Sequence, residues 1–189
     1  VNPPSQKRYG KYGAVTGIVH PIGLAYLAGY LRKEEFSVKI IDAYALNLDL
    51  ESTRRRIEHE EFDLFGTTAH TMGFDISVGV IEAAKDSNPN AVTVIGGPHP
   101  SALPYETLQA SNKIDVVVRM EGEQTALEIA ERIEKKKALD DVRGTVVRTT
   151  DGKLKANLDR PPIKDINSIP FPAYDLLPHE KYRASPHHS

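Results

Sequence analysis

Two glycines, Gly96 and Gly97, follow directly after a short apolar run in the middle of the chain, and Pro98, His99 and Pro100 come next. Because glycine has no side chain, such a pair at a strand end either forms a tight turn or lets a ligand approach the backbone closely. The two prolines restrict the backbone of the loop that would hold the ligand. The sequence therefore predicts a ligand-contacting loop here, with His99 as a candidate contact.

A second apolar run ends in Thr67, Thr68, Ala69 and His70. All of these except Ala69 have polar side chains. The threonine hydroxyls can donate hydrogen bonds to phosphate or amide oxygens, and the imidazole of His70 would face either a ligand or solvent.

A third group, Glu121, Gly122 and Glu123, precedes an expected helix. Carboxylates at a helix start disfavour a bound polyphosphate and suit amide or hydroxyl donors, although they are also common there without any ligand.

Short Val- and Ile-rich runs alternate with segments of helical periodicity, which is typical of βαβ units and a parallel sheet. The expected strands are Val38–Ile41, Leu64–Thr68, Ala91–Ile95 and Val116–Arg119. The expected helices are Gly23–Glu34, Asp49–Glu60, Phe74–Asn88, Leu103–Ala110 and Glu123–Lys137. These elements predict a doubly wound α/β domain of three layers. We expect Ala25, Ala28 and Gly29 of the first helix to pack closely on the sheet.

Ligands of open parallel sheets bind outside the carboxyl ends of the strands. That rule brings together four predicted loops: Asn2–Pro4 with Arg8–Ile22, Thr67–Met72, Gly96–Ser101, and Met120–Gln124.

Three regions divide the chain. Residues 1–142 form the α/β domain, and Val1–Pro4 would be the stub of a first strand that starts earlier. Residues 143–158, with the turn Asp151-Gly152, predict a β-hairpin at the sheet edge. Residues 159–189 hold five prolines before position 179 and predict an extended linker that leads to another domain.

The formal net charge of −2 provides no general attraction to nucleic acid or anionic lipid, and no apolar run approaches the roughly 20 residues of a membrane span. We therefore expect a cytoplasmic chain with neither as a partner. Without cysteine, these residues supply no disulfide and no thiolate ligand.

Five motifs, in this order, resemble the amino-terminal part of cobalamin-dependent radical S-adenosylmethionine enzymes, a family that includes magnesium-protoporphyrin monomethyl ester cyclase-like proteins. They are Pro21–Ala28, Gly96–Pro100, Arg119–Glu123, Asp151–Lys153 and Ile169–Leu176. The resemblance implies a flavodoxin-like (Rossmann-like) domain that holds cobalamin with its nucleotide tail detached from cobalt. It also implies a partner within the same protein, a radical barrel that carries the [4Fe-4S] cluster and S-adenosylmethionine. The domain alone would catalyse nothing, whereas the whole enzyme would transfer a methyl group or carry out a radical oxidation or cyclisation.

By the same resemblance, three loops would contact the cofactor. Their residues are Thr67, Thr68, Ala69, His70, Gly96, Gly97, Pro98, His99, Pro100, Glu121, Gly122 and Glu123. The hydroxyls would hold the tail, and a side chain at Gly96 or Gly97 would collide with it.

The candidate cobalt ligand is His20. Related cobalamin domains carry Asp-x-His-x-x-Gly after the first strand, whereas this chain has Ile18 in the aspartate position before His20 and Gly23. The carboxylate that would orient the imidazole is therefore absent. The alternative is that His20 lies in the loop before the helix without contacting cobalt.

Two other classes of function remain open. One is a module of the same fold that binds no cobalamin and instead docks the barrel or presents substrate. The other is a flavin or nucleotide domain, which is disfavoured because the residues after Asn2 include two prolines where a phosphate site needs amide donors.

Overall fold

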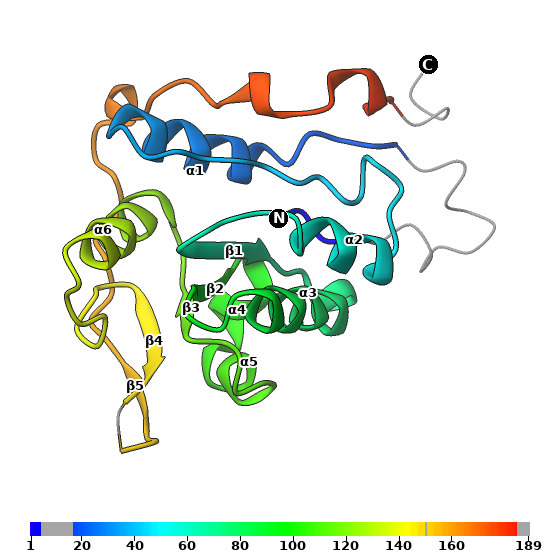
Figure 1. Cartoon of the computed structure of the whole chain (residues 1–189). Coiled ribbons are helices and arrows are strands. Elements are labelled where there is room, and N and C mark those ends of the chain that lie inside the picture. The colour runs from blue at the N-terminus through cyan, green and yellow to red at the C-terminus, as the bar shows by residue number, and fades with distance from the viewer. Residues whose placement is uncertain (5–16, 150, 185–189) are drawn as a thin grey trace.

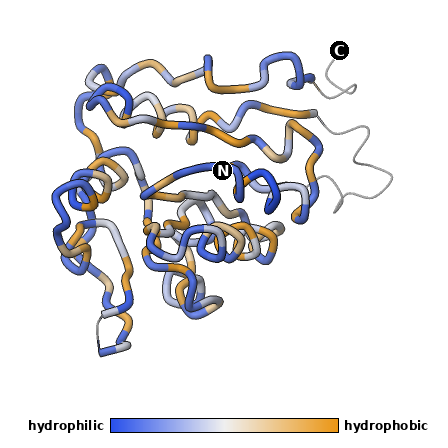
Figure 2. The backbone as a smooth tube through the Cα atoms, viewed as in Figure 1, coloured by the Kyte–Doolittle hydropathy of each residue, from blue (hydrophilic) through white to orange (hydrophobic). Residues whose placement is uncertain are grey.

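The computed structural model describes residues 1–4, 17–149 and 151–184, and its centre is one five-stranded sheet (Figure 1). The strands, in spatial as well as sequence order, are β1 (Leu64–Thr68), β2 (Val92–Gly96), β3 (Val116–Val118), β4 (Thr145–Arg148) and β5 (Leu154–Ala156). The first three are parallel, and the other two are antiparallel. The predicted α/β class is confirmed, but the sheet is mixed because the hairpin β4–β5 pairs with β3. Figure 2 shows that the tip of this hairpin is hydrophilic.

Helices cover both faces of the sheet. They are α1 (Ile22–Lys33), α2 (Leu50–Ile57), α3 (Phe74–Ser87), α4 (Pro98–Ala102), α5 (Pro104–Gln109) and α6 (Glu123–Glu134). Alternation along β3 separates two hydrophobic cores: Val117 packs with the α3 side, whereas Val116 and Val118 pack with Ile129 of α6. None of the helices described is long and apolar enough to span a membrane.

The short helix α4 differs from the loop expected between Gly96 and Ser101. Its first residue is Pro98, and the amide of Ser101 donates to the Gly97 carbonyl at 3.0 Å. A proline at the first helical position loses no hydrogen bond and already has a helical φ. The Pro-His-Pro segment is thus a helix start rather than an open loop.

The predicted strand Val38–Ile41 is wrong as a strand. Within the part of the chain that the structure describes, the segment forms no ladder, and the nearest bridge is the pair Asn2–Asp42 directly after it. The Asn2 amide donates to Ile41 O at 2.9 Å, and the Ala43 amide donates to Asn2 O at 3.0 Å. A strand needs a paired partner along its length, and among the described residues this segment has no such partner beyond the bridge at Asn2.

The expected packing of Ala25 and Gly29 on the sheet is also wrong. These two residues of α1 face the carboxyl-terminal segment: the Ala173 amide donates to Ala25 O at 2.9 Å, and a Cβ on Gly29 would lie 2.5 Å from Phe171 O. Small side chains here let another backbone approach the helix. In consequence, α1 is held beside α6 and away from the sheet.

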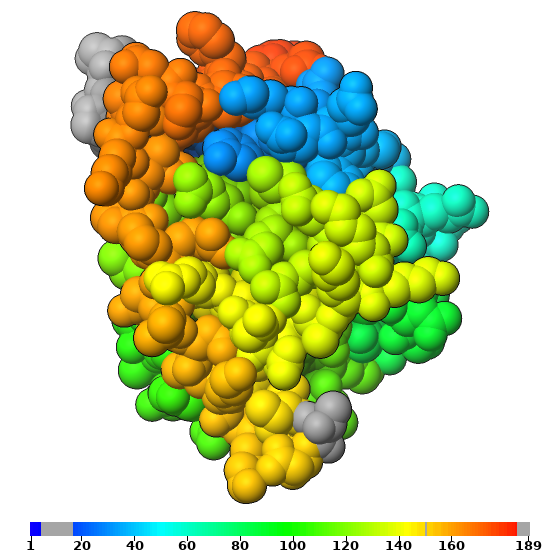
Figure 3. Space-filling view, turned by 90° about the vertical axis from the view of Figure 1, so that its left-hand side faces the viewer, coloured from blue at the N-terminus to red at the C-terminus, as the bar shows by residue number. Residues whose placement is uncertain are grey.

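Residues 159–184, which we call the strap, run back along α1 (Figures 1 and 3). They contain three short 3-10 turns at Ile166–Ser168, Tyr174–Leu176 and His179–Lys181. Side-chain contacts anchor both ends of the strap. Arg160 Nε donates to Thr125 Oγ1 of α6 at 2.8 Å, and Tyr182 Oη donates to Asp42 Oδ2 at 2.7 Å.

Candidate functional site

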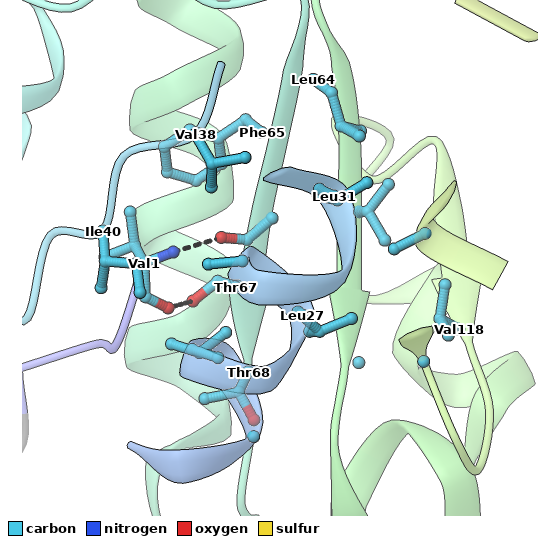
Figure 4. Close-up of a pocket in the computed structure, with 18 of the residues that line it drawn as sticks. Val1, Leu27, Leu31, Val38, Ile40, Leu64, Phe65, Thr67, Thr68 and Val118 are labelled. Atoms are coloured by element: carbon cyan, nitrogen blue, oxygen red, sulfur yellow. Dashed lines mark hydrogen bonds between the residues drawn. The ribbon is translucent and has the colours of Figure 1, made fainter. Parts of the chain in front are cut away.

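A cavity of about 1480 Å³ lies between α1, α6, the sheet and the extended segment after α1 (Figure 4). It has two connected parts. The edge arm lies beside β1, between that strand and Val38 and Ile40. The helix-side arm lies above the sheet face, below Leu27 and Leu31 of α1. Interiors are normally close-packed, so an apolar space of this size inside a domain is the most suitable place for a large ligand.

The floor of the helix-side arm is the face of β1, β2 and β3 that lies opposite α3. Its residues are Leu64, Gly66, Thr68, Val94, Gly96 and Val118. The roof consists of apolar side chains of α1, namely Leu24, Leu27 and Leu31. Ala126, Ile129 and Ile133 of α6 also line the cavity, and Ile129 and Ile133 pack on the sheet beside it. This arm is therefore apolar along its length.

Two glycines leave the floor bare. A Cβ on Gly66 would have only Val94 O near it, at 4.0 Å, and a Cβ on Gly96 would lie 3.6 Å from Val118 O and 3.7 Å from Val118 Cβ. Both positions would accept a side chain without clashing with the protein, so the open space above them is available to a ligand. Gly66 is not among the contacts predicted from the sequence, although a glycine inside a strand run is a signal for close approach.

Gly97 has a different role. Its φ of +106° lies in the region that favours glycine, and a Cβ there would lie 2.6 Å from Thr68 Oγ1 and 3.0 Å from Ala69 O. The turn between β2 and α4 therefore requires this glycine by itself. A side chain at Gly97 would collide with the protein before it reached any ligand.

The structure brings nine of the twelve predicted contact residues to the cavity wall. They are Thr67, Thr68, His70, Gly96, Gly97, Pro98, Glu121, Gly122 and Glu123. It does not bring Ala69, His99 and Pro100 there. The His99 ring packs on Phe74 with centroids 4.1 Å apart, and its Nδ1 lies 3.3 Å from Thr71 Oγ1, so it fills the space between two loops.

Two of the polar lining groups already have partners within the chain. Thr67 Oγ1 donates to Val1 O at 3.0 Å, and Glu121 Oε2 accepts from the amide of Ile163 in the strap at 2.8 Å. Thr68 lies on the floor at the carboxyl end of β1, where its side chain faces the cavity (Figure 4). Of the two adjacent threonines, Thr68 is therefore the one placed to contact a ligand.

His20 lines the cavity beside the start of α1. Its ring stacks on Tyr182 of the strap with a centroid separation of 3.9 Å, and Tyr174 lies edge-on at 5.8 Å. Tyr182 in turn donates to the buried Asp42, and burial together with this carboxylate raises the pKa of the Tyr182 hydroxyl. Stacking on Tyr182 thus orients the His20 ring, a task that the aspartate absent at position 18 would otherwise perform. Within the described residues no three His, Asp or Glu side chains form a metal-binding group.

Comparisons with known proteins identify the family. The family profile of the B12 binding domain matches residues 12–130, and the chain belongs to that family. It is 38% identical over 184 residues to an uncharacterized methyltransferase of Pyrococcus horikoshii, and the alignment covers 97% of this chain and 39% of that protein. It is 33% identical over 172 residues to an anaerobic magnesium-protoporphyrin IX monomethyl ester cyclase of Rubrivivax gelatinosus, which covers 89% of this chain and 31% of the cyclase.

The fold is shared with a solved radical enzyme. The structure of OxsB, a cobalamin-dependent S-adenosylmethionine radical enzyme with aqua-cobalamin and S-adenosylmethionine bound, superposes with a TM-score of 0.77 at 18% identity over 93% of this chain and 24% of OxsB. The chain is thus a B12-binding domain that is homologous to the methyltransferase and the cyclase above and shares its fold with OxsB. It spans about two fifths or less of the length of the sequence relatives described above.

The residues at the cavity fit such a cofactor. An apolar space over two bare glycines suits an aromatic group, and the polar groups Thr68, His70 and Glu123 beyond the carboxyl ends of the strands suit the amides and hydroxyls of a large polar ligand.

Proposed function

We propose that this domain holds cobalamin in its base-off form, with the nucleotide tail inserted in the helix-side arm. The observation that carries the proposal is the apolar space between α1, α6 and the sheet, whose floor at Gly66 and Gly96 has no side chains. The strap supports this arrangement because it binds the outer side of α1 and so keeps the helix away from the sheet.

The chain's own residues would bind and orient the cofactor. Thr68 would donate its hydroxyl to the tail at the carboxyl end of β1, and Gly96 would leave the space that the tail occupies. His70, Pro98 and Glu123 would line the mouth where the corrin lies. His20, stacked on Tyr182, would lie at that mouth as the candidate axial group. Bound cobalamin supplies a cobalt centre that carries a methyl group or exchanges electrons.

The relatives suggest the chemistry of the whole protein. One is named a methyltransferase and another an anaerobic magnesium-protoporphyrin IX monomethyl ester cyclase, so the reaction would be methyl transfer or radical oxidation and cyclisation. It would require a radical barrel with a [4Fe-4S] cluster and S-adenosylmethionine, docked at the corrin side. This domain would contribute position and shielding, because a reactive cofactor is protected by the surface that binds it.

Binding can be tested with the purified chain, hydroxocobalamin and gel filtration. We expect co-elution of cobalamin with a visible spectrum of the base-off form, and loss of binding in Gly96→Leu, whose side chain would fill the floor. The matched control is Gly73→Leu, because a Cβ on Gly73 meets nothing within 4 Å and Gly73 does not line the cavity. Failure of the folded wild-type chain to retain cobalamin, or equal retention by Gly96→Leu, would contradict the proposal.

A further inference from the structure

The helix-side arm provides no hydrogen-bonding partner along its middle. Among the described residues its floor and roof are Leu27, Leu31, Leu64, Val94 and Val118, with Ile129 and Ile133 of α6. The polar lining residues lie at its two ends. Thr68 ends β1 and Glu123 begins α6 at one end, and at the other end Glu134 is the last residue of α6 and Lys136 follows it.

The backbone of this arm is also occupied. The backbone groups of the floor strands lie in the plane of the sheet, where β1 pairs with β2 and β2 with β3, and the outer edge of β1 faces the edge arm rather than this one. The helices α1 and α6 bond their own amides and carbonyls internally. A ring buried between these layers therefore meets methyl and methylene groups on both faces. Any donor or acceptor that the ring carries there loses its hydrogen bonds to water and gains none from the protein.

Natural cobamides differ in the aromatic base at the end of their nucleotide tail. A dimethylbenzimidazole base, once detached from the metal, has one acceptor nitrogen and two methyl groups. An adenine base has an amino group with two N–H donors and several ring acceptors. Each buried polar group without a partner weakens binding, so adenine loses more on entering this arm.

We propose that the helix-side arm selects the tail base, so that this chain binds a benzimidazole cobamide in preference to an adenine cobamide. The proposal rests on the proposed function above and adds a specificity to the same site. The residues that determine it are Leu31, Val94 and Val118, which supply apolar surface where a purine needs hydrogen bonds.

Equilibrium dialysis of the full chain against three corrinoids tests the proposal. They are cobalamin, its adenine counterpart with the same corrin, and cobinamide, which lacks the nucleotide tail. We expect cobalamin to bind on the order of tenfold more tightly than the adenine form, because one or two unsatisfied polar groups have effects of this size. Cobinamide should bind more weakly than cobalamin because the arm is left without its ring.

Two isosteric variants distinguish an effect of the helix-side arm on binding from a general effect on folding. Val118→Thr places a hydroxyl on the cavity face of β3, where it can form a hydrogen bond with an adenine base. It should therefore lower the ratio of the affinity for cobalamin to that for the adenine form severalfold. Val117→Thr places the same hydroxyl on the opposite face of the same strand, within the core beside α3, and should leave the ratio unchanged.

The outcomes are distinguishable. Equal affinity for cobalamin and the adenine form, or an unchanged ratio in a folded Val118→Thr, overturns the base selection while cobalamin binding itself stands. Binding of no corrinoid by the folded chain overturns the proposed function and the selection together. Far-ultraviolet circular dichroism of each variant verifies that it is folded.

Discussion

Gly66 shows how one residue can serve a ligand at a cost to its own strand. A glycine inside a strand has no side chain to pack, and it loses more conformational entropy on folding than other residues do. At Gly66, however, a Cβ would meet only Val94 O, at 4.0 Å. We therefore expect Gly66→Val to leave the thermal midpoint of the ligand-free chain unchanged or higher, while cobalamin affinity falls at least tenfold. Calorimetry and equilibrium dialysis on the same samples measure both. A loss of stability without a loss of affinity would show that the strand, rather than the cavity, requires glycine.

The hydrogen bond from Tyr182 to Asp42 predicts a dependence on alkaline pH. The folded-state pKa of Tyr182 is raised above its ordinary value of 10, so its contribution to stability is complete below pH 10 and is lost as the pH rises further. At pH 8, Tyr182→Phe should lower the free energy of unfolding by about 1.5–3 kcal/mol, the range for a hydrogen bond to a charged group. Chemical denaturation at pH 8 and pH 11 gives the comparison. A difference between wild type and variant that does not shrink at pH 11 would be inconsistent with this account.

At the scale of elements, the contact between α1 and the strap depends on Gly29. An alanine in a helix is normally more stable than glycine by about 1 kcal/mol. At Gly29, however, the added Cβ would lie 2.5 Å from the Phe171 carbonyl, so the strap must move. We expect Gly29→Ala to destabilise the chain and to increase proteolytic cleavage within residues 164–184.

Gly23 provides the matched control on the same helix, because a Cβ there meets nothing within 4 Å. Gly23→Ala should stabilise the chain and leave strap cleavage unchanged. Limited proteolysis with mass spectrometry measures the cleavage. If the strap of Gly29→Ala is as well protected as that of Gly23→Ala, then α1 and the strap are not held together at Gly29.

For the whole molecule, the layered arrangement predicts that ligand binding and stability are linked. The apolar arm leaves Leu27 and Leu31 of α1 above an open space over the sheet, whereas Ile129 of α6 packs directly on β3, and a bound ring would fill that space. At a cobalamin concentration 100 times Kd, binding adds about 2.7 kcal/mol to the free energy of unfolding. A chain of this size should then melt roughly 5–10 °C higher.

Hydrogen exchange locates that stabilisation. We expect added cobalamin to slow exchange most in α1 and β1, and least in β4 and β5, which lie outside the cavity. A uniform change over all elements, or a change confined to the hairpin, would argue that cobalamin binds elsewhere.

Local residue patterns were sufficient for much of the fold. Alternating apolar runs located β1, β2 and β3, and helical periodicity located α1, α3 and α6, because both signals come from neighbours in the chain. The position of Gly96-Gly97 after a strand, together with the rule for parallel sheets, placed three polar loops at one edge of the molecule. Motifs in family order predicted the cobalamin family itself, which the comparisons confirm.

Tertiary structure decided what each of these residues does. The register of β1 with β2 places Gly66 and Gly96 on the same face, toward the cavity. Ala25 and Gly29 contact the strap rather than the sheet, and His99 packs on Phe74 rather than lining the cavity. None of these outcomes is encoded within one local segment, because each depends on which distant backbone lies opposite. The sequence by itself thus determined the elements and the family, whereas packing between distant segments determined the cavity and the residues that line it.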